Sequence, residues 1–295
     1  MTAAPRTRRV IIDTDAKNEA DDQFAIVHAL LSETLDVRGL IAAHFGTERS
    51  DTSMLDSRAE IDLLLEHLGR SDVRVENGAA DPLPDETIAA DSPGARLIVE
   101  EARREGEGPL QIAFLGPLTD MAAALLLDPG IAETDTTVIW IGGPGYGERE
   151  TGDRSEFNLR NDIVAANVVF RSGIRIWQVP RTSYVMTSVG YAELEEKVRP
   201  CGELGAYLVD QLIDWNATWH REPIEHRALG DSPAIGLMLN PMGGQFRTVP
   251  APTFGAEGGL LPGTGGTVRV CELYDGRYLL EDMFAKLRRF AASRG

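Results

Sequence analysis

The sequence predicts an α/β fold: a mostly parallel central sheet with helices on both faces, Rossmann-like, plus a C-terminal β-hairpin. Three observations predict it. Short apolar runs that end at glycine or polar residues alternate with longer segments of helical periodicity. Strands that alternate with helices pair in parallel, and such sheets are covered on both faces. Near the C-terminus, Asp275-Gly276 separates two strand-like runs, which is typical of a two-residue hairpin turn.

The N-terminal part of the chain contains two strand-and-helix pairs. The apolar run Val10–Ile12 predicts a buried strand, and residues 21–31 follow as a helix with one apolar face. Val37–Ala43 predicts the second strand. The helix after it ends at Gly69, because glycine favours the left-handed conformation found just past helix ends.

The middle of the chain continues this alternation. The predicted elements are strand Leu110–Leu115, a helix carrying Met121–Leu127 with Pro117 in its first turn, strand Thr137–Ile141, a helix from the N-cap Asp162 to Phe170, and strand Ile174–Val179. No stretch has the composition of a linker. We therefore expect one domain over residues 1–295, with residues 1–9 flexible.

The composition excludes several classes of partner. The chain has 29 Lys+Arg and 46 Asp+Glu, a net charge of −17 with histidine neutral. Nucleic acid and anionic membrane surfaces need clustered positive charge, so we expect neither as a partner. The chain has no apolar run of the roughly 18–20 residues that span a bilayer, and its start lacks the apolar core of a signal peptide. We therefore expect a cytoplasmic protein.

Aspartates gather where the first predicted strand ends and the next helix begins, at Asp13, Asp15, Asp21 and Asp22. Ligands bind beyond the carboxyl ends of parallel strands. Two like charges 4 Å apart cost about 1 kcal/mol in water and about 4 kcal/mol at an effective dielectric of 20, so confined aspartates favour a bound divalent cation. Oxygen-only ligands select Ca²⁺ or Mg²⁺. The alternative is a solvated acidic loop.

The residues Val10–Asp15 together with Asp21–Ile26 resemble the amino-terminal signature of the nucleoside hydrolases, which are nucleoside N-ribohydrolases. Further motifs that resemble this family follow in the same order, and together they cover about residues 10–240: Asn77–Leu83, Leu115–Asp120, Ile141–Gly143, Glu156–Asn158 with Asp162, and Gly230–Ala234. Each motif is short, and their shared order makes the resemblance specific.

The resemblance implies a Ca²⁺ site. The ligands it implies are Asp15, Asp22 as a bidentate ligand, the backbone carbonyl of Thr119, and Asp231. Asp13 would accept a hydrogen bond behind these ligands and orient one of them. The ligands are far apart in the sequence but close to predicted strand ends, as expected for a site at one edge of the sheet.

The resemblance also implies how the substrate is held. Glu156 and Asn158 match family residues that bind the ribose. Asp21 is one residue from Asp22, about 100° around the helix, and would face ribose hydroxyls rather than the metal. The stretch containing Trp219 supplies aromatic residues that stack on the base in the family, so Trp219 is the expected stacking residue.

The implied reaction is hydrolysis of the N-glycosidic bond of a ribonucleoside or related N-riboside to free base and sugar. An acidic pocket stabilises the positive charge of the oxocarbenium-like state. Water bound to Ca²⁺ would attack with Asp15 as the base, and the anomeric configuration would invert because no covalent intermediate is implied. The resemblance also implies a homodimer or homotetramer and a role in purine or pyrimidine salvage.

The chain departs from the family pattern between Asp15 and Asp21. Five residues, Ala16–Ala20, separate these aspartates where the family usually has three. Asn18 or Glu19 in this longer loop could therefore take part in ribose binding.

A second departure concerns the departing base. Gly230 stands where one branch of the family has the histidine that protonates the base, and glycine has no proton to donate. His44, at the end of the second strand, and His220, near Trp219, are the candidate acids. Of these we favour His44, because its place at a strand end is the better determined.

Other functions stay open at this point. A non-catalytic Ca²⁺-dependent protein that binds sugars or nucleosides would share the fold and ligands, and a hydrolase could act on a different glycoside. A phosphatase is disfavoured because a net charge of −17 repels phosphate esters. We also expect uncharged nucleosides to be preferred to their 5′-phosphates, because the motif residues Asp21, Glu156 and Asn158 near the expected sugar hydroxyls contribute negative charge and no cation. Arg154 and Arg160 are the flanking cations that argue against this.

Overall fold

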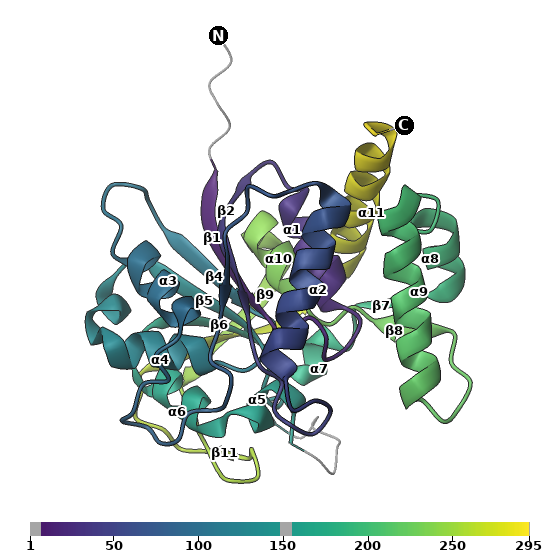
Figure 1. Cartoon of the computed structure of the whole chain (residues 1–295). Helices are drawn as coiled ribbons and strands as arrows, with labels where there is room; N and C mark the ends of the chain where they lie inside the picture. The colour runs from purple at the N-terminus through teal and green to yellow at the C-terminus, as the bar shows by residue number, and fades with distance from the viewer. Residues whose placement is uncertain (1–6, 148–154, 295) are drawn as a thin grey trace.

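The computed structural model describes residues 7–147 and 155–294, and a twisted eight-stranded sheet lies at its centre (Figure 1). All neighbouring strands pair in parallel except the last two, which are antiparallel. In spatial order the strands are β3 (Val75–Asn77), β2 (Leu35–Ala42), β1 (Arg8–Thr14), β4 (Leu110–Phe114), β5 (Thr136–Ile141), β6 (Arg175–Val179), β12 (Thr267–Tyr274) and β9 (Gly244–Pro250). The predicted fold class is confirmed.

Helices cover both faces of this sheet, because alternate residues of its central strands point to opposite sides. Val10 and Ile12 of β1 belong to one hydrophobic cluster and Ile11 to the other. The first cluster includes residues of α1 (Asp22–Leu30), α2 (Ser53–Leu68), α10 (Ser232–Leu239) and α11 (Gly276–Ala292), and the second includes residues of α3 (Pro93–Ala102), α4 (Thr119–Leu127) and α6 (Ile163–Arg171).

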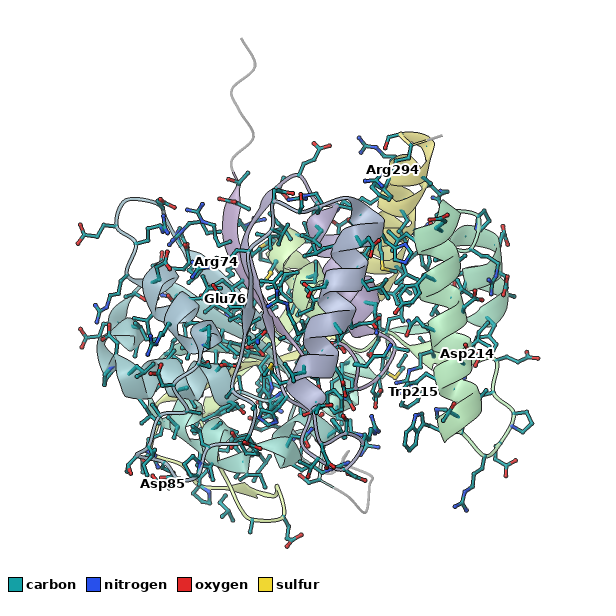
Figure 2. The ribbon with its side chains drawn as sticks, in the orientation of Figure 1. Arg74, Glu76, Asp85, Asp214, Trp215 and Arg294 are labelled. Atoms are coloured by element: carbon teal, nitrogen blue, oxygen red, sulfur yellow. The ribbon has the colours of Figure 1, made fainter. Side chains whose placement is uncertain are left out.

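Smaller elements surround the carboxyl edge of the sheet. The short antiparallel pair β7 (Ser188–Gly190) and β8 (His226–Ala228) lies beside α8 (Tyr191–Lys197) and the long helix α9 (Gly202–Trp219). Trp215 lies near the C-terminal end of α9 (Figure 2). The remaining elements are α5 (Phe157–Asn161), α7 (Arg181–Tyr184), the pair β10 (Thr253–Phe254) and β11 (Leu260–Leu261), and the 3₁₀ turns Pro129–Glu133 and Pro241–Gly243.

Local signals explain several of the helix ends. Asp162 caps α6 by accepting a hydrogen bond from the N–H of Ala165 at 2.8 Å, as predicted. Gly69 follows α2 with φ of 63°, which only glycine adopts at little cost. Pro117, by contrast, lies before α4 rather than in its first turn, because that helix begins at Thr119.

The antiparallel C-terminal strands are present, but the turn predicted for them is wrong. β12 pairs with β9, and Asp275 instead caps α11 by accepting a hydrogen bond from the N–H of Tyr278 at 2.9 Å. An aspartate followed by glycine suits either a hairpin or a helix N-terminus, and the amphipathic segment Gly276–Ala292 selects the helix.

The chain termini and membrane topology complete this comparison with the sequence. Of the nine N-terminal residues predicted to be flexible, 1–6 lie outside the described residues, whereas Arg8 and Arg9 belong to β1. Within the described residues, no helix combines the length and apolar content needed to cross a membrane. A single domain remains a prediction.

Candidate active site

An inner cavity of about 50 Å³ lies at the carboxyl edge of the sheet, where β1, β4 and β5 end. This is the edge at which open α/β sheets bind ligands. The inner cavity is lined by Asp15, Asn18, Glu19, Asp21, Asp22, Leu115, Ile141, Glu156, Phe157, Asn158, Tyr184, Gly230 and Asp231. Carboxylates therefore dominate its polar lining.

The polypeptide brings three of these aspartates together from distant parts of the sequence. Asp15 follows β1, Asp22 opens α1, and Asp231 directly precedes α10. The N-terminal end of a helix favours a nearby negative charge. Gly116, just past β4, packs against Asp15: a Cβ at position 116 would lie 3.0 Å from the Asp15 carboxyl carbon. A side chain there would thus crowd the Asp15 carboxylate.

The carboxylates of Asp21, Asp22 and Asp231 form one compact group. Each offers an oxygen, and these three oxygens lie within 4.8 Å of one another. The backbone N–H of Gly230 donates to Asp21 at 2.8 Å, and the hydroxyl of Thr14 donates to Asp22. The carboxyl groups of Asp22 and Asp231 also interact directly with one another.

Burial raises the pKa of all four aspartates in the inner cavity. The pKa of Asp21 rises to about 7, although the guanidinium of Arg227 lowers it, and that of Asp22 rises to about 6. Burial first, and the neighbouring carboxylates second, raise the pKa of Asp15 and of Asp231 well above the ordinary value. These groups cannot all ionise without a compensating positive charge.

The donor set fits a hard divalent cation. Asp15 Oδ2 is buried and has no hydrogen-bond partner among residues 7–147 and 155–294. Carboxylate oxygens are the ligands that Ca²⁺ and Mg²⁺ prefer. Of the predicted ligands, Asp15, Asp22 and Asp231 line the inner cavity together. Asp21 differs from expectation, because its carboxylate joins this group instead of pointing away from it.

The remaining predicted ligand, Thr119, lies in the first turn of α4 and its side chain is engaged elsewhere. Its hydroxyl donates to Asp162 Oδ2 at 2.8 Å and contacts His44 Nε2 at 2.8 Å. Thr119 does not line the inner cavity. The role predicted for its backbone carbonyl therefore stays a prediction.

Asp13 lies behind the inner cavity and does not line it. Burial first, and the charge of Asp120 second, raise its pKa well above the ordinary value, and neither of its carboxylate oxygens has a hydrogen-bond partner among the described residues. Asp120 in turn accepts from the hydroxyl of Ser92 at 2.5 Å and the N–H of Ala79 at 3.0 Å. A Cβ at Gly78 would lie 2.2 Å from Asp120, so the motif around residues 77–83 packs on this pair. Asp13 thus lies close to Asp120, and its expected role of orienting a metal ligand stays a prediction.

Glu156 and Asn158, predicted to bind ribose, lie on the opposite wall of the inner cavity. Glu156 accepts hydrogen bonds from the hydroxyl of Tyr184 at 2.9 Å and from three backbone N–H groups. Asn158 Nδ2 donates to the backbone carbonyls of Leu115 and Ile141 at 2.6 and 2.9 Å. Asn158 therefore ties the ends of β4 and β5 together, and its Oδ1 accepts nothing from the described part of the chain.

The longer loop between Asp15 and Asp21 reaches toward the mouth of the site. Asn18 lines the inner cavity, and both its backbone carbonyl and its side-chain oxygen accept from Arg49. Glu19 pairs with Arg227 and lies 3.7 Å from Arg49. The loop thus contacts arginines from two other parts of the chain.

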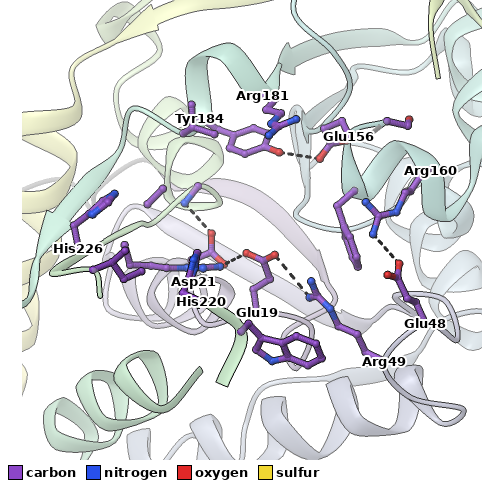
Figure 3. A pocket seen from close by; sticks show the side chains of 18 residues that line it. Glu19, Asp21, Glu48, Arg49, Glu156, Arg160, Arg181, Tyr184, His220 and His226 are labelled. Carbon is purple, nitrogen blue, oxygen red and sulfur yellow. Dashed lines mark hydrogen bonds and ion pairs between the residues drawn. The ribbon is translucent and has the colours of Figure 1, made fainter. Parts of the chain in front are cut away.

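A larger outer cavity of about 710 Å³ adjoins the inner one (Figure 3). Trp219 and His220, both predicted substrate-binding residues, line it at the end of α9. The Trp219 side chain is 53% exposed, and the guanidinium of Arg49 lies 5.2 Å from its ring centroid. An exposed aromatic face beside an acidic pocket is suited to stacking on a planar ring.

His44 lies outside both cavities, so the structure does not bring this predicted leaving-group acid together with the other candidate site residues. Its ring is buried, Nδ1 accepts from the N–H of Gly46 at 3.2 Å, and Nε2 lies 2.8 Å from the Thr119 hydroxyl. Burial lowers the pKa of His44 to about 4. The neutral ring therefore lies between the residues that follow β2 and the start of α4.

The residues that sequence reasoning missed are Tyr184 and the arginines of the outer cavity, which are Arg49, Arg160, Arg181 and Arg227. Arg160 was considered only as a flanking charge, and Arg154 lies outside the described residues. Arg181 and Tyr184 follow β6 directly. The strand-end rule that pointed to Asp15 could have found both.

Comparisons with known proteins agree with this geometry. A model of the family described as inosine-uridine preferring nucleoside hydrolase matches residues 10–276. A pyrimidine-specific ribonucleoside hydrolase of Photobacterium profundum is 26% identical over 263 residues, which are 80% of this chain and 81% of that protein. A protein of the same description from Citrobacter koseri is 28% identical over 234 residues, 72% of either chain.

Solved structures show the same fold. A plant nucleoside hydrolase superposes with a TM-score of 0.76 at 24% identity, covering 95% of this chain and 99% of that chain. A purine-preferring ribonucleoside hydrolase from Gardnerella vaginalis has a TM-score of 0.76 at 20% identity, covering 96% and 99%.

Proposed function

The chain belongs to the inosine-uridine preferring nucleoside hydrolase family, and from that premise we propose that it is a Ca²⁺-dependent enzyme that hydrolyses the N-glycosidic bond of ribonucleosides or related N-ribosides. The products would be free base and sugar. The observation that carries the proposal is the inner cavity, where four buried aspartates converge at the carboxyl edge of the sheet. Relatives described as pyrimidine-specific and as purine-preferring are both similar to this chain, so the test spans both kinds of base.

The proposed metal ligands are Asp15, Asp22, Asp231 and the backbone carbonyl of Thr119. When bound, Ca²⁺ supplies positive charge that lets these carboxylates ionise and that acidifies and orients the attacking water. Asp15 would accept the proton of that water, because burial raises its pKa and its Oδ2 has no other partner in the described residues. Attack opposite the departing base would invert the anomeric carbon.

Asp21 and Asn158 would hold the ribose hydroxyls. The carboxylate of Asp21 and the Oδ1 of Asn158 can both accept hydrogen bonds in the inner cavity. Glu156 accepts four hydrogen bonds and would therefore hold a fixed negative charge in the lining of the inner cavity. The oxocarbenium-like state would therefore form among carboxylates, which stabilise its positive charge.

The base would leave into the outer cavity. Trp219 would stack on the base there. Asn18, in the longer loop between Asp15 and Asp21, would contact the sugar. Gly230 has no side chain, so we propose His220, which lines the outer cavity, as the proton donor in place of His44. A purine departs poorly as an anion, and an acid typically accelerates such a step 10²–10⁴-fold.

The test is release of reducing sugar from a panel of purine and pyrimidine nucleosides and other glycosides, with calcium and after chelation. Release that needs calcium supports the proposal. Binding without release would favour a non-catalytic nucleoside-binding protein, and release from other glycosides alone would change the substrate class. We further propose nucleoside salvage in the cytoplasm by a homodimer or homotetramer, for which light scattering of the purified protein tests the assembly.

A further inference from the structure

Over its whole lining, the outer cavity balances four arginines against the carboxylates of Glu19, Asp21, Glu48 and Glu156, but the part that the inner cavity does not share is basic. Among the described residues that line it without also lining the inner cavity, four are arginines and one, Glu48, is a carboxylate. This part of the lining thus carries a net charge of +3, whereas the whole chain carries −17. A concave surface with an excess of one sign concentrates ligands of the other sign.

Three of these arginines already have carboxylate partners. Arg227 pairs with Glu19, which also lies 3.7 Å from Arg49, and Arg160 pairs with Glu48 at 2.8 Å. Arg49 lies against aromatic rings as well, 4.7 Å from the ring centroid of Phe157 and 5.2 Å from that of Trp219. These contacts fix the three guanidinium groups in the wall.

Arg181 differs from the other three. Its side chain is exposed to the outer cavity and makes no hydrogen bond or ion pair with any residue that the structure describes. Figure 3 shows it beside Tyr184 and Glu156. Glu156 cannot serve as its partner, because both carboxylate oxygens are taken by the Tyr184 hydroxyl and backbone N–H groups. The backbone N–H of Arg181 donates to the Gly143 carbonyl at 3.0 Å, which anchors the residue.

We propose that the outer cavity binds an anionic group of the substrate and that Arg181 donates hydrogen bonds to this group. This inference rests on the proposed function. A guanidinium offers paired N–H donors whose geometry matches a phosphate or a carboxylate. An anchored arginine without a partner among the described residues, in the basic part of the outer cavity, is suited to such a group. The substrate class would then be an anionic N-riboside, which reverses the preference for uncharged nucleosides expected from the sequence.

The anionic group has two chemical sources, which are a phosphate on the ribose and a carboxylate on the base. Figure 3 shows Arg181 beside Glu156, which also lines the inner cavity where the ribose would lie, and the experiment decides between the two sources. The experiment therefore uses uridine as the uncharged substrate, uridine 5′-monophosphate for the phosphate, and orotidine for the carboxylate.

The test compares kcat/KM for these three compounds in the calcium-loaded full-length protein and its Arg181→Gln variant. At least one anionic compound should exceed uridine by about tenfold, and Arg181→Gln should lower that value about 10- to 100-fold while changing uridine less than about threefold. The compound that loses efficiency identifies the source. Added salt should reduce the advantage of the anionic compound but not the rate with uridine.

The control is Arg277→Gln, which replaces an exposed arginine at the start of α11 that lines neither cavity. It should leave all three compounds unchanged. Arg181→Lys should lie between the wild type and Arg181→Gln, because it keeps the charge but not the paired donors. If uridine is hydrolysed at least as well as both anions, and Arg181→Gln affects all three alike, the inference is wrong while the proposed function stands.

Calorimetry separates a failure of the inference from a failure of the proposed function. Ribose 5-phosphate and orotate are titrated into the wild type and into Arg181→Gln, with ribose for comparison. If no compound is hydrolysed, the proposed function fails, and binding of either anion that is lost in Arg181→Gln still supports an anion site. The absence of binding of both anions by the wild type would overturn the inference.

Discussion

The inner and outer cavities share part of their lining but are built for opposite charges. In the inner cavity, burial raises the pKa values of Asp15, Asp22 and Asp231, and a cation would relieve this cost. The outer cavity adds four arginines and an exposed tryptophan, which favour an anion or an aromatic ring. A substrate that spans both cavities would face carboxylates at one end and arginines at the other, with the bond to be broken between them.

The two cavities also differ in how the chain builds them. The inner one is made by strand ends and helix starts of the central sheet, and its aspartates are buried. The outer one is made by loops, the short helix α7 and the end of α9, where Trp219 and His220 are exposed. Substitutions in the inner cavity should therefore change stability and activity together, and those in the outer cavity activity alone.

The largest effect is expected at Asp22. Asp22→Ala should abolish turnover and calcium binding, because it removes a ligand whose oxygen lies within 4.8 Å of those of Asp21 and Asp231. It should also remove the stabilisation by bound metal, about 4 kcal/mol when free calcium is about a thousand times its Kd. Elemental analysis after dialysis and thermal unfolding with and without calcium measure both effects.

The control is Asp214→Asn on the exposed surface of α9 (Figure 2), which should change neither metal content nor melting temperature. Unchanged metal content in Asp22→Ala would remove Asp22 from the site. A lower melting temperature that calcium does not affect in either protein would mean that Asp22 acts only in the fold.

The next largest effect concerns His220 in the outer cavity. His220→Gln should slow hydrolysis of inosine about 10²–10⁴-fold and leave a nitrophenyl riboside nearly unchanged, because nitrophenolate departs without an acid. The melting temperature should stay the same, since His220 is exposed at the end of α9. Steady-state rates with the two substrates provide the measurement.

Two histidine variants serve as comparisons. His67→Gln, on α2 and outside both cavities, should have no effect on either substrate. His44→Gln should lower stability, because His44 links Gly46 to Thr119, without treating the two substrates differently. Equal slowing of both substrates by His220→Gln would make His220 a positioning residue, and no slowing would exclude it as the acid.

Most of the fold was predictable because its signals are local. Runs such as Val10–Ile12 and caps such as Asp162 and Gly69 depend on neighbouring residues alone, and the structure contains each of them. The hairpin at Asp275 failed because the same dipeptide can start a helix, and only the seventeen residues of α11 decide between the two. The long-range pairing of β12 with β9 has no short-range signal.

The candidate site was predictable to the extent that strand ends define it. Asp15 follows β1 directly, and its place after a strand was enough to predict that it lines the inner cavity. His44 also follows a strand, but position does not say which way a side chain points, and His44 turned toward Thr119. Arg49 and Arg227 meet Glu19 from separate segments, so no spacing in the sequence could reveal that they share a wall.

A smaller effect is expected at Trp219. Trp219→Ala should raise KM about tenfold with little change in kcat, because stacking of a base on an aromatic ring is worth about 1–3 kcal/mol. At 53% exposure the side chain contributes little to folding, so the melting temperature should hold. Met242→Ala, which truncates a side chain that is 93% exposed and outside both cavities, is the control. An unchanged KM would assign stacking to another residue.

The smallest expected effect concerns the pH dependence of protein stability, which should have opposite signs in the metal-free and the calcium-bound protein. Burial raises the pKa of Asp21 to about 7 and that of Asp22 to about 6, above the value of 3.8 in the unfolded chain. A raised pKa in the folded state contributes stability that is fully present below the unfolded pKa and is lost as the pH rises through the folded pKa. The metal-free protein should therefore become more stable as the pH falls from about 8 to about 5.5.

Bound calcium should reverse this slope. Calcium requires the ionised carboxylates, so protons compete with it and the stabilisation it gives should shrink as the pH falls over the same range. Urea unfolding of stripped and of calcium-saturated protein at both pH values measures the two slopes. Arg181 does not line the inner cavity, so Arg181→Gln should leave both slopes unchanged and serves as the control. Parallel slopes with and without calcium would show that the metal does not bind these aspartates. The inner cavity would then not be a cation site, and the contrast in charge between the two cavities would be wrong.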